Sequence, residues 1–216
     1  MLKSNRFIVL GGALLSAFAL VTLPANGGAS PDAPYVAPKD KALIVFVRNG
    51  RASKEAPFVI FDEDGKCVAV HGEEDSELVP MEPGKHTLYT MSYNIKRMEF
   101  DVAAGRTYFV EIVLPRYGAG TIKVTMAKRD SDAFKEVKTW VKGKAASDPK
   151  GDVCRGTEMQ SSLEGSKRAS KRGTTARYDR KTDTADEKWN AADDAYRATW
   201  TMNKEDGFTA EEAKKL

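Results

Sequence analysis

The sequence predicts a mainly β protein, built as an antiparallel two-sheet β-sandwich of seven or eight strands. Short runs of apolar residues recur about every ten residues between positions 42 and 127, some of them alternating with polar residues. Gly and Pro separate these runs, and no helical spacing of apolar residues lies between them. Strands joined by such short turns leave no room for parallel crossovers, so we expect antiparallel pairing.

Each expected strand is bounded by residues that favour turns. Gly65 suits the positive φ of a hairpin turn, and Pro83-Gly84 and Ala104-Gly105 mark two further turns. The first run (ALIVFVR) is dense in β-branched and aromatic residues and is expected to be buried. The expected strands span residues 42–48, 57–62, 66–71, 77–81, 85–93, 96–102, 107–114 and 121–127.

A short helix is expected directly after the last strand, at residues 130–141. Its apolar residues recur at helical spacing, at Phe134, Val137 and Val141. Ser131 or Asp132 suits the N-cap position, and Gly143 lies just beyond the expected end. We therefore expect one helix packed on the sandwich, with Trp140 near the contact.

The remainder of the chain is expected to be a disordered basic linker, residues 144–185, and a C-terminal helical segment, residues 186–216. The linker has few large apolar residues, so it buries too little surface to offset its ordering entropy. Residues 186–202 place Trp189, Tyr196 and Trp200 on one face of an amphipathic helix. That aromatic face is expected to dock on the sandwich or on a partner. Thr209 and Glu212 have the spacing of a capping box.

The amino terminus has the pattern of a secretory signal peptide. Lys3 and Arg6 precede a run of 17 uncharged residues, 7–23, and small residues follow up to Ala29. We expect residues 1–29 to be removed, residues 30–40 to form a leader, and residues 41–143 to form the sandwich with its trailing helix. The mature chain is then periplasmic or secreted. The alternative is an uncleaved membrane anchor, for which the run is short.

Charge is distributed unevenly along the chain. Residues 31–143 carry 17 basic and 17 acidic side chains, the linker carries 10 and 6, and the C-terminal segment carries 5 and 8. A neutral body gives no reason to expect nucleic acid as a partner, because duplex binding needs a concentrated basic face. The basic pairs Lys167-Arg168 and Lys171-Arg172 are candidate contacts for anionic envelope polymers, or simply parts of a solvated linker.

Cys67 and Cys154 are the two cysteines of the chain, and an oxidising compartment would permit a disulfide between them. The alternative is a buried Cys67 and a free Cys154. Two cysteines and two histidines without paired spacing do not predict a zinc site, and we expect no cofactor.

Two turns carry a resemblance to a known family. Residues 81–88 (MEPGKHTL) and 104–110 (AGRTYFV) resemble an uncharacterised family of bacterial exported β-sandwich domains, in which Pro-Gly-x-His and Ala-Gly-Lys-x-Tyr-Phe turns each lead a strand. Similar turns occur in transthyretin-like and carboxypeptidase-regulatory-like sandwiches. The resemblance implies the sandwich fold and no catalytic residues. Many members are lipoproteins, whereas this chain has no Cys directly after its small-residue region.

These observations predict a non-enzymatic module of the cell envelope that binds another envelope protein or polymer. Trp189, Tyr196 and Trp200 are the candidate contacts, together with the two basic pairs. The alternative is a periplasmic hydrolase or metal-dependent enzyme that uses His71, His86 and the acidic loop at residues 73–77. Residues 202–213 do not have the carboxylate spacing of a calcium-binding loop.

Overall fold

Among the described residues, eight strands coincide with the eight predicted runs, each within a few residues at its ends. The structure is a computed structural model and describes residues 33–49, 58–64, 67–71, 76–91, 95–113, 123–147 and 175–216. The strands are β1 (Ala42–Asn49), β2 (Phe58–Asp62), β3 (Cys67–His71), β4 (Ser76–Met81), β5 (Gly84–Met91), β6 (Ile95–Val102), β7 (Thr107–Val113) and β8 (Lys123–Met126). The prediction of a mainly β fold is confirmed.

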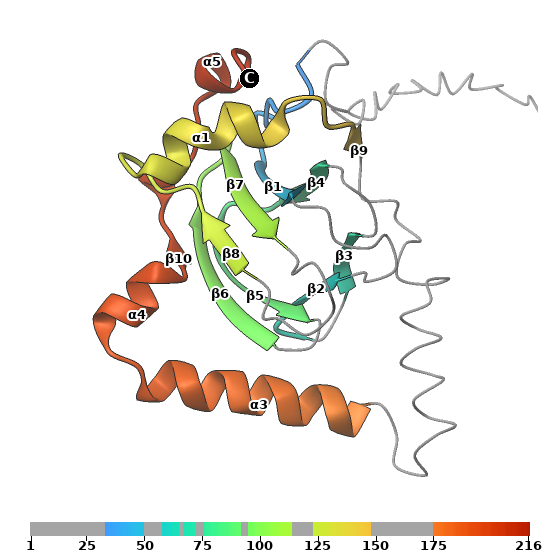
Figure 1. Cartoon of the computed structure of the whole chain (residues 1–216), viewed down its shortest axis with the longest axis vertical. Helices are drawn as coiled ribbons and strands as arrows, with labels where there is room; N and C mark the ends of the chain where they lie inside the picture. The colour runs from blue at the N-terminus through green and yellow to red at the C-terminus, as the bar shows by residue number, and fades with distance from the viewer. Residues whose placement is uncertain are drawn as a thin grey trace, which may run out of the picture.

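The described strands form two five-stranded sheets (Figure 1). The first sheet has the order β8-β7-β1-β4-β9, in which β9 (Ala146–Ser147) is a two-residue strand. The second sheet has the order β10-β6-β5-β2-β3, in which β10 (Thr201–Met202) comes from the C-terminal region. The chain passes back and forth between the sheets, which places strands distant in sequence side by side.

The expectation of purely antiparallel sheets is wrong, because three pairs of described strands run parallel. β1 pairs with β7 in parallel, from Leu43 opposite Thr107 to Asn49 opposite Val113. β4 with β9 and β6 with β10 are also parallel. The short-turn argument applies only to strands that are consecutive in sequence. Between β1 and β7 the chain forms β2 to β6, which is ample length to return in the same direction.

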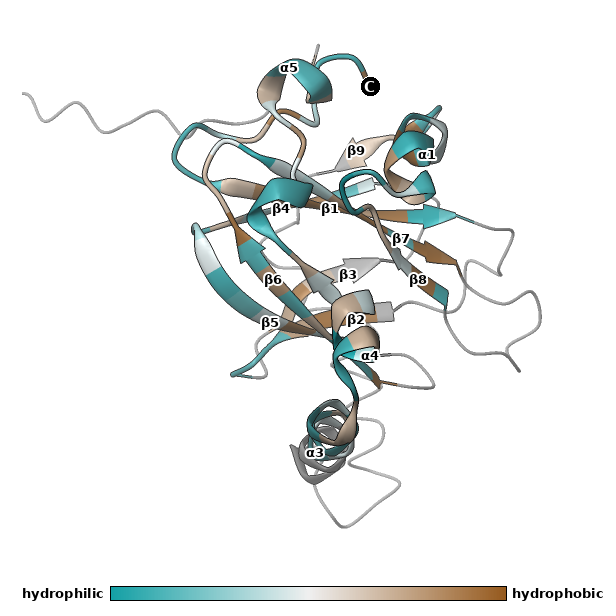
Figure 2. Cartoon of the chain, turned by 90° about the vertical axis from the view of Figure 1, so that its left-hand side faces the viewer, coloured by the Kyte–Doolittle hydropathy of each residue, from teal (hydrophilic) through white to brown (hydrophobic). Residues whose placement is uncertain are grey.

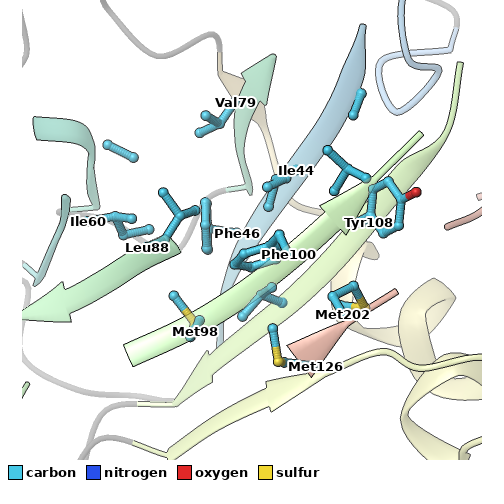
Figure 3. Packing of buried hydrophobic residues seen from close by; sticks show 14 of the residues in the cluster. Ile44, Phe46, Ile60, Val79, Leu88, Met98, Phe100, Tyr108, Met126 and Met202 are labelled. Atoms are coloured by element: carbon cyan, nitrogen blue, oxygen red, sulfur yellow. The ribbon is translucent and has the colours of Figure 1, made fainter. Parts of the chain in front are cut away.

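The layer between the two sheets is an apolar core. Ile44 and Phe46 of β1 point from the first sheet toward Leu88, Met98 and Phe100 of the second (Figure 3). All five side chains are buried. They occupy alternate positions of their strands, which is the period that places side chains on one face of a sheet. The alternation seen in the sequence therefore corresponds to the inner faces of the sandwich.

The first sheet is buried on its other face as well. Leu43, Val45 and Val47 of β1 belong to a second apolar cluster with Val137 and Trp140 of the helix α1 (Asp132–Val141). Figure 2 shows the resulting layers in order: α1 and α5 (Ala210–Ala213), the first sheet, the second sheet, and α3 (Thr175–Ala191) on the far side. Burial on both faces explains why β1 is a continuous apolar run.

The predicted helix after the last strand is confirmed, and its ends follow the predicted signals. The Ser131 side chain caps the first turn of α1 by accepting a hydrogen bond from the Phe134 backbone N–H at 3.1 Å. At the other end Gly143 has a φ of +71°, a conformation that side chains with a Cβ rarely adopt. The expected contact of Trp140 is present, because this side chain is buried.

The C-terminal region differs from the expectation in two places. The helix α3 spans Thr175–Ala191, so it begins within the segment expected to be disordered. It then ends, and the chain continues as a separate helix, α4 (Asp194–Thr199), followed by β10, a short 3-10 helix η1 (Lys204–Asp206) and α5. The single amphipathic helix expected at residues 186–202 is therefore wrong.

Docking explains why α3 is helical despite its few apolar residues. Ala185 is buried, and Tyr89 and Arg97 of the second sheet both donate hydrogen bonds to the Asp186 carboxylate. These contacts anchor the helix, and an anchored helix extends at low cost because nucleation is the expensive step. Composition alone could not reveal contacts with a sheet formed some 90 residues earlier.

Residues 1–29, predicted to form the signal peptide, lie outside the described residues. Within the described part of the chain, no helix combines the length and the apolar character needed to cross a bilayer.

Candidate functional site

Three aromatic and two cationic side chains gather around the β6 edge of the second sheet. This aromatic–basic surface consists of Lys96, Arg97, Trp189, Tyr196 and Trp200. Strand β6 supplies both cations, and the segment from α3 to α4 supplies the aromatic side chains. Figure 1 shows β10, which follows α4, next to β6, and α3 below the sheets.

Asp193 is the reason that the chain turns between the two helices. Its extended backbone ends α3, and its Oδ1 atom accepts a hydrogen bond from the Tyr196 backbone N–H at 2.7 Å. This N-cap starts α4 in a new direction. The Trp200 carbonyl then accepts a hydrogen bond from the Glu99 backbone N–H at 2.9 Å, which fixes the end of α4 against β6.

One half of the surface is formed by Tyr196, Trp200 and Lys96. The Tyr196 and Trp200 rings have centroids 6.3 Å apart and an interplanar angle of 47°. Trp200 is partly buried against the inter-sheet core, while Tyr196 is 39% exposed. Lys96 Nζ lies 5.2 Å from the centroid of the Trp200 ring, a cation–π arrangement. No carboxylate among the described residues forms an ion pair with Lys96.

The other half is an ion-pair network that holds α3. Arg97 bridges Glu99 and Asp186, and its guanidinium carbon lies 5.1 Å from the centroid of the Trp189 ring. Tyr89 Oη donates to Asp186 Oδ1 at 2.8 Å. Burial lowers the pKa of Arg97, but the hydrogen bonds to Glu99 and Asp186 outweigh burial and the net pKa lies above its ordinary value. Arg97 is thus engaged within the protein.

The two halves lie on opposite sides of the second sheet. Neighbouring residues of a strand point to opposite faces, so Lys96 and Arg97 diverge. The prediction placed Trp189, Tyr196 and Trp200 on one helical face, but the turn at Asp193 puts Trp189 with Arg97 and the other two rings with Lys96. The sequence feature that indicated this turn is Asp193, a residue type that favours the N-cap position, directly after Ala191 and Ala192. No sequence pattern indicated Lys96 and Arg97, because their proximity to the aromatic rings depends on how residues 175–216, the tail, dock on the second sheet.

A second polar cluster, which sequence reasoning missed, lies at one end of the inter-sheet core. Arg48 of β1 and Glu77 of β4 are 1% and 4% exposed and point from the same face of the first sheet, since Phe46 is opposite Glu77. Thr90 of β5 is fully buried at the same end of the sandwich, and its Oγ1 atom has no hydrogen-bond partner among the described residues. Arg48 and Glu77 thus carry opposite charges on adjacent strands of the first sheet.

The histidines of the alternative enzyme hypothesis do not lie together. His86 is near the start of β5, where its Nε2 atom is 2.7 Å from the Glu82 carbonyl oxygen. His71 ends β3 opposite Phe58, and Val59 is opposite Met91 at the far end of β5. About six residues of strand, roughly 20 Å, therefore separate the two backbones.

The structure describes only part of the acidic loop at residues 73–77. Residues 73–75 lie outside the described residues, and Glu77 is buried in β4 rather than solvated in a loop. Near the C-terminus, Asp206 accepts hydrogen bonds from the backbone N–H groups of Arg129 and Asn203, at 2.8 and 2.7 Å. Across the described ranges, no group of three or more His, Cys, Asp or Glu side chains has the geometry of a metal site.

Cys67 is disulfide-bonded in the structure. Cys154 lies outside the described residues, so its predicted pairing with Cys67 stays a prediction. The basic pairs Lys167-Arg168 and Lys171-Arg172 also lie outside them, and their proposed contacts are untested.

Comparison with known proteins does not place the chain in a family. No protein-family model matches the sequence, and a search of curated proteins finds no similar one.

Proposed function

We propose that this protein is a non-enzymatic, exported module of the cell envelope that binds another envelope protein or polymer through the Tyr196–Trp200–Lys96 half of the aromatic–basic surface. The observation that carries the proposal is the exposure of Tyr196, the one large hydrophobic side chain exposed among the described residues. Tyrosine and tryptophan are enriched where binding energy is concentrated, because they offer a large rigid contact area. Tyr196 stands beside Trp200, which the core holds in place.

Export is supported by the sequence of residues 1–29 and fits the disulfide at Cys67, since disulfides persist in oxidising compartments. Two measurements test this part of the proposal. Cell fractionation should find the protein outside the cytosol, and intact mass should match a chain that begins near residue 30. A full-length cytosolic product would contradict it.

Co-sedimentation with purified cell envelopes tests the binding part. The mature chain should sediment with envelopes, and Tyr196→Ser should reduce the bound fraction at least fivefold, because it removes the exposed ring without disturbing the buried core. Lys138→Gln is the control, since Lys138 is exposed on α1, which packs on the first sheet and not on the second. Equal sedimentation of Tyr196→Ser and the unaltered chain would exclude this surface as the binding site. Repeating the assay with protease-treated envelopes separates a polymer from a protein partner.

A further inference from the structure

We infer that the Tyr196–Trp200–Lys96 half of the aromatic–basic surface binds a glycan that carries acidic groups. This inference rests on the proposed function and names the chemical class of its partner. Three features of the surface support it: its aromatic geometry, its charge and its small size.

The aromatic geometry suits a sugar ring. Tyr196 and Trp200 are inclined at 47° with centroids 6.3 Å apart, so they form a shallow angle rather than a closed stack. The faces of aromatic rings are electron-rich and attract weakly positive C–H groups, which line one face of many sugar rings. Tyr196 also presents a phenolic hydroxyl, which can donate or accept a hydrogen bond with sugar hydroxyls.

Lys96 favours an acidic partner although Asp193 and Asp194 lie near Tyr196, because Asp194 is paired with Arg197 and Asp193 caps α4. Lys96 has no ion-pair partner among the described residues, in contrast to Arg97, which is paired with Glu99 and Asp186. The Lys96 ammonium is held beside the aromatic pair by its contact with the Trp200 ring. A carboxylate or phosphate on a sugar stacked on the exposed Tyr196 ring would therefore lie near an available cation.

The small size of the surface favours a glycan over a protein. Specific protein interfaces bury about 1,200–2,000 Å² and centre on several desolvated apolar side chains. Among the described residues one large hydrophobic side chain is exposed, and Asp193, Asp194 and Arg197 surround it with charge. A sugar ring needs only the two rings and a few polar groups, so this surface has the extent that a glycan requires.

Binding of three soluble probes to the mature chain tests the inference, with Trp fluorescence and calorimetry as readouts. The probes are hexagalacturonate, a neutral glucohexaose of equal length, and poly-L-glutamate. We expect hexagalacturonate to bind at least fivefold more tightly than glucohexaose, and poly-L-glutamate to bind no better than glucohexaose. Salt should weaken the binding of hexagalacturonate because Lys96 is only partly buried and its contact is screened by ions.

Two substitutions assign the binding to this surface. Tyr196→Ala should weaken hexagalacturonate binding at least fivefold, and Lys96→Gln should reduce the preference over glucohexaose to about onefold. Lys138→Gln should leave both affinities unchanged, and thermal unfolding of each variant verifies that it is folded. Absence of hexagalacturonate binding, equal binding of glucohexaose, tighter binding of poly-L-glutamate, or insensitivity to Tyr196→Ala would each overturn the inference. If the chain still sediments with envelopes in a Tyr196-dependent and protease-sensitive manner, the proposed function survives and the glycan alone is excluded.

Discussion

At the scale of single residues, Arg129 fastens the C-terminal segment to the body of the protein. Its Nη1 atom donates to Glu212 Oε1 at 2.8 Å, and its Nη2 atom donates to the Gly207 carbonyl at 2.7 Å. The guanidinium carbon also lies 4.2 Å from the centroid of the Phe134 ring, which stacks on Phe208. One side chain thereby joins the start of α1 to the segment that leads into α5.

The contact between Arg129 and Glu212 predicts a loss of stability in acid. The hydrogen bond from Arg129 lowers the pKa of Glu212 from 4.5 to about 2, against the opposing effect of burial. The stabilisation is thus complete above about pH 4.5, the pKa of the unfolded chain, and is lost as pH falls toward 2. Glu212 is 38% exposed, so solvent screening keeps the effect modest.

We expect Glu212→Gln to flatten the fall in free energy of unfolding between pH 4.5 and pH 2, measured by denaturant titration. Glu136→Gln, on the exposed face of α1, should leave the slope unchanged.

Gly207 is a second residue whose identity is constrained by packing. A Cβ atom at this position would lie 2.7 Å from the Tyr108 ring and 2.8 Å from Arg106 Cβ. The φ of Gly207 is −70°, so alanine would suit the backbone but not the space. We expect Gly207→Ala to destabilise the protein by about 1–3 kcal/mol in thermal unfolding, because crowding a packed site forces its neighbours to move. As a control, Ala104→Ser adds one atom at an exposed position and should have little effect. Equal stability of both variants would show that the segment around Gly207 shifts freely.

At the scale of elements, the tail is a series of short pieces that each dock separately. α3 is held on the second sheet through Asp186, α4 begins at the Asp193 cap, and β10 adds two residues beside β6. α5 begins with the predicted capping box, in which Thr209 and Glu212 exchange hydrogen bonds. Such short elements have little stability of their own, so the contacts with the sheets determine their positions.

The Asp193 cap provides a test of this dependence. Asp193→Ala should lower the free energy of unfolding by about 1 kcal/mol, since it leaves the Tyr196 backbone N–H without its partner. Asp193→Asn keeps a capping oxygen and should restore most of the loss. Hydrogen exchange should locate the change in α4, with the strands of the first sheet unaffected. A loss of protection spread evenly over both sheets would contradict a local role for the cap.

At the scale of the whole molecule, the C-terminal segment completes both apolar layers. Met202 of β10 is buried in the inter-sheet core (Figure 3), whereas Phe208 and Ala213 are buried in the layer between the first sheet and α1. Phe208 also forms a backbone bridge with Thr107 at the start of β7. The tail is therefore part of the fold, so an experiment that deletes it would confuse loss of binding with loss of structure.

Truncation after Trp200 should reveal this role. We expect the shortened chain to lose cooperative thermal unfolding, because removing Met202 and Phe208 leaves cavities in both layers, and large-to-small changes at one buried site already cost about 2–5 kcal/mol. Near-ultraviolet circular dichroism and calorimetry would report the loss. A truncated chain that unfolds cooperatively at the original temperature would show that the tail only covers a finished core.

The sequence by itself determined the local features of this protein. Short apolar runs, some of them alternating with polar residues, located the eight strands, and turn and capping residues located the ends of α1 and the start of α5. These signals depend on neighbours in the chain. The tertiary structure alone decided that β1 pairs in parallel with β7, that the tail divides at Asp193, and that Lys96 and Arg97 lie beside the tail tryptophans. Those arrangements depend on contacts between segments up to about 100 residues apart, whose energies no local pattern records.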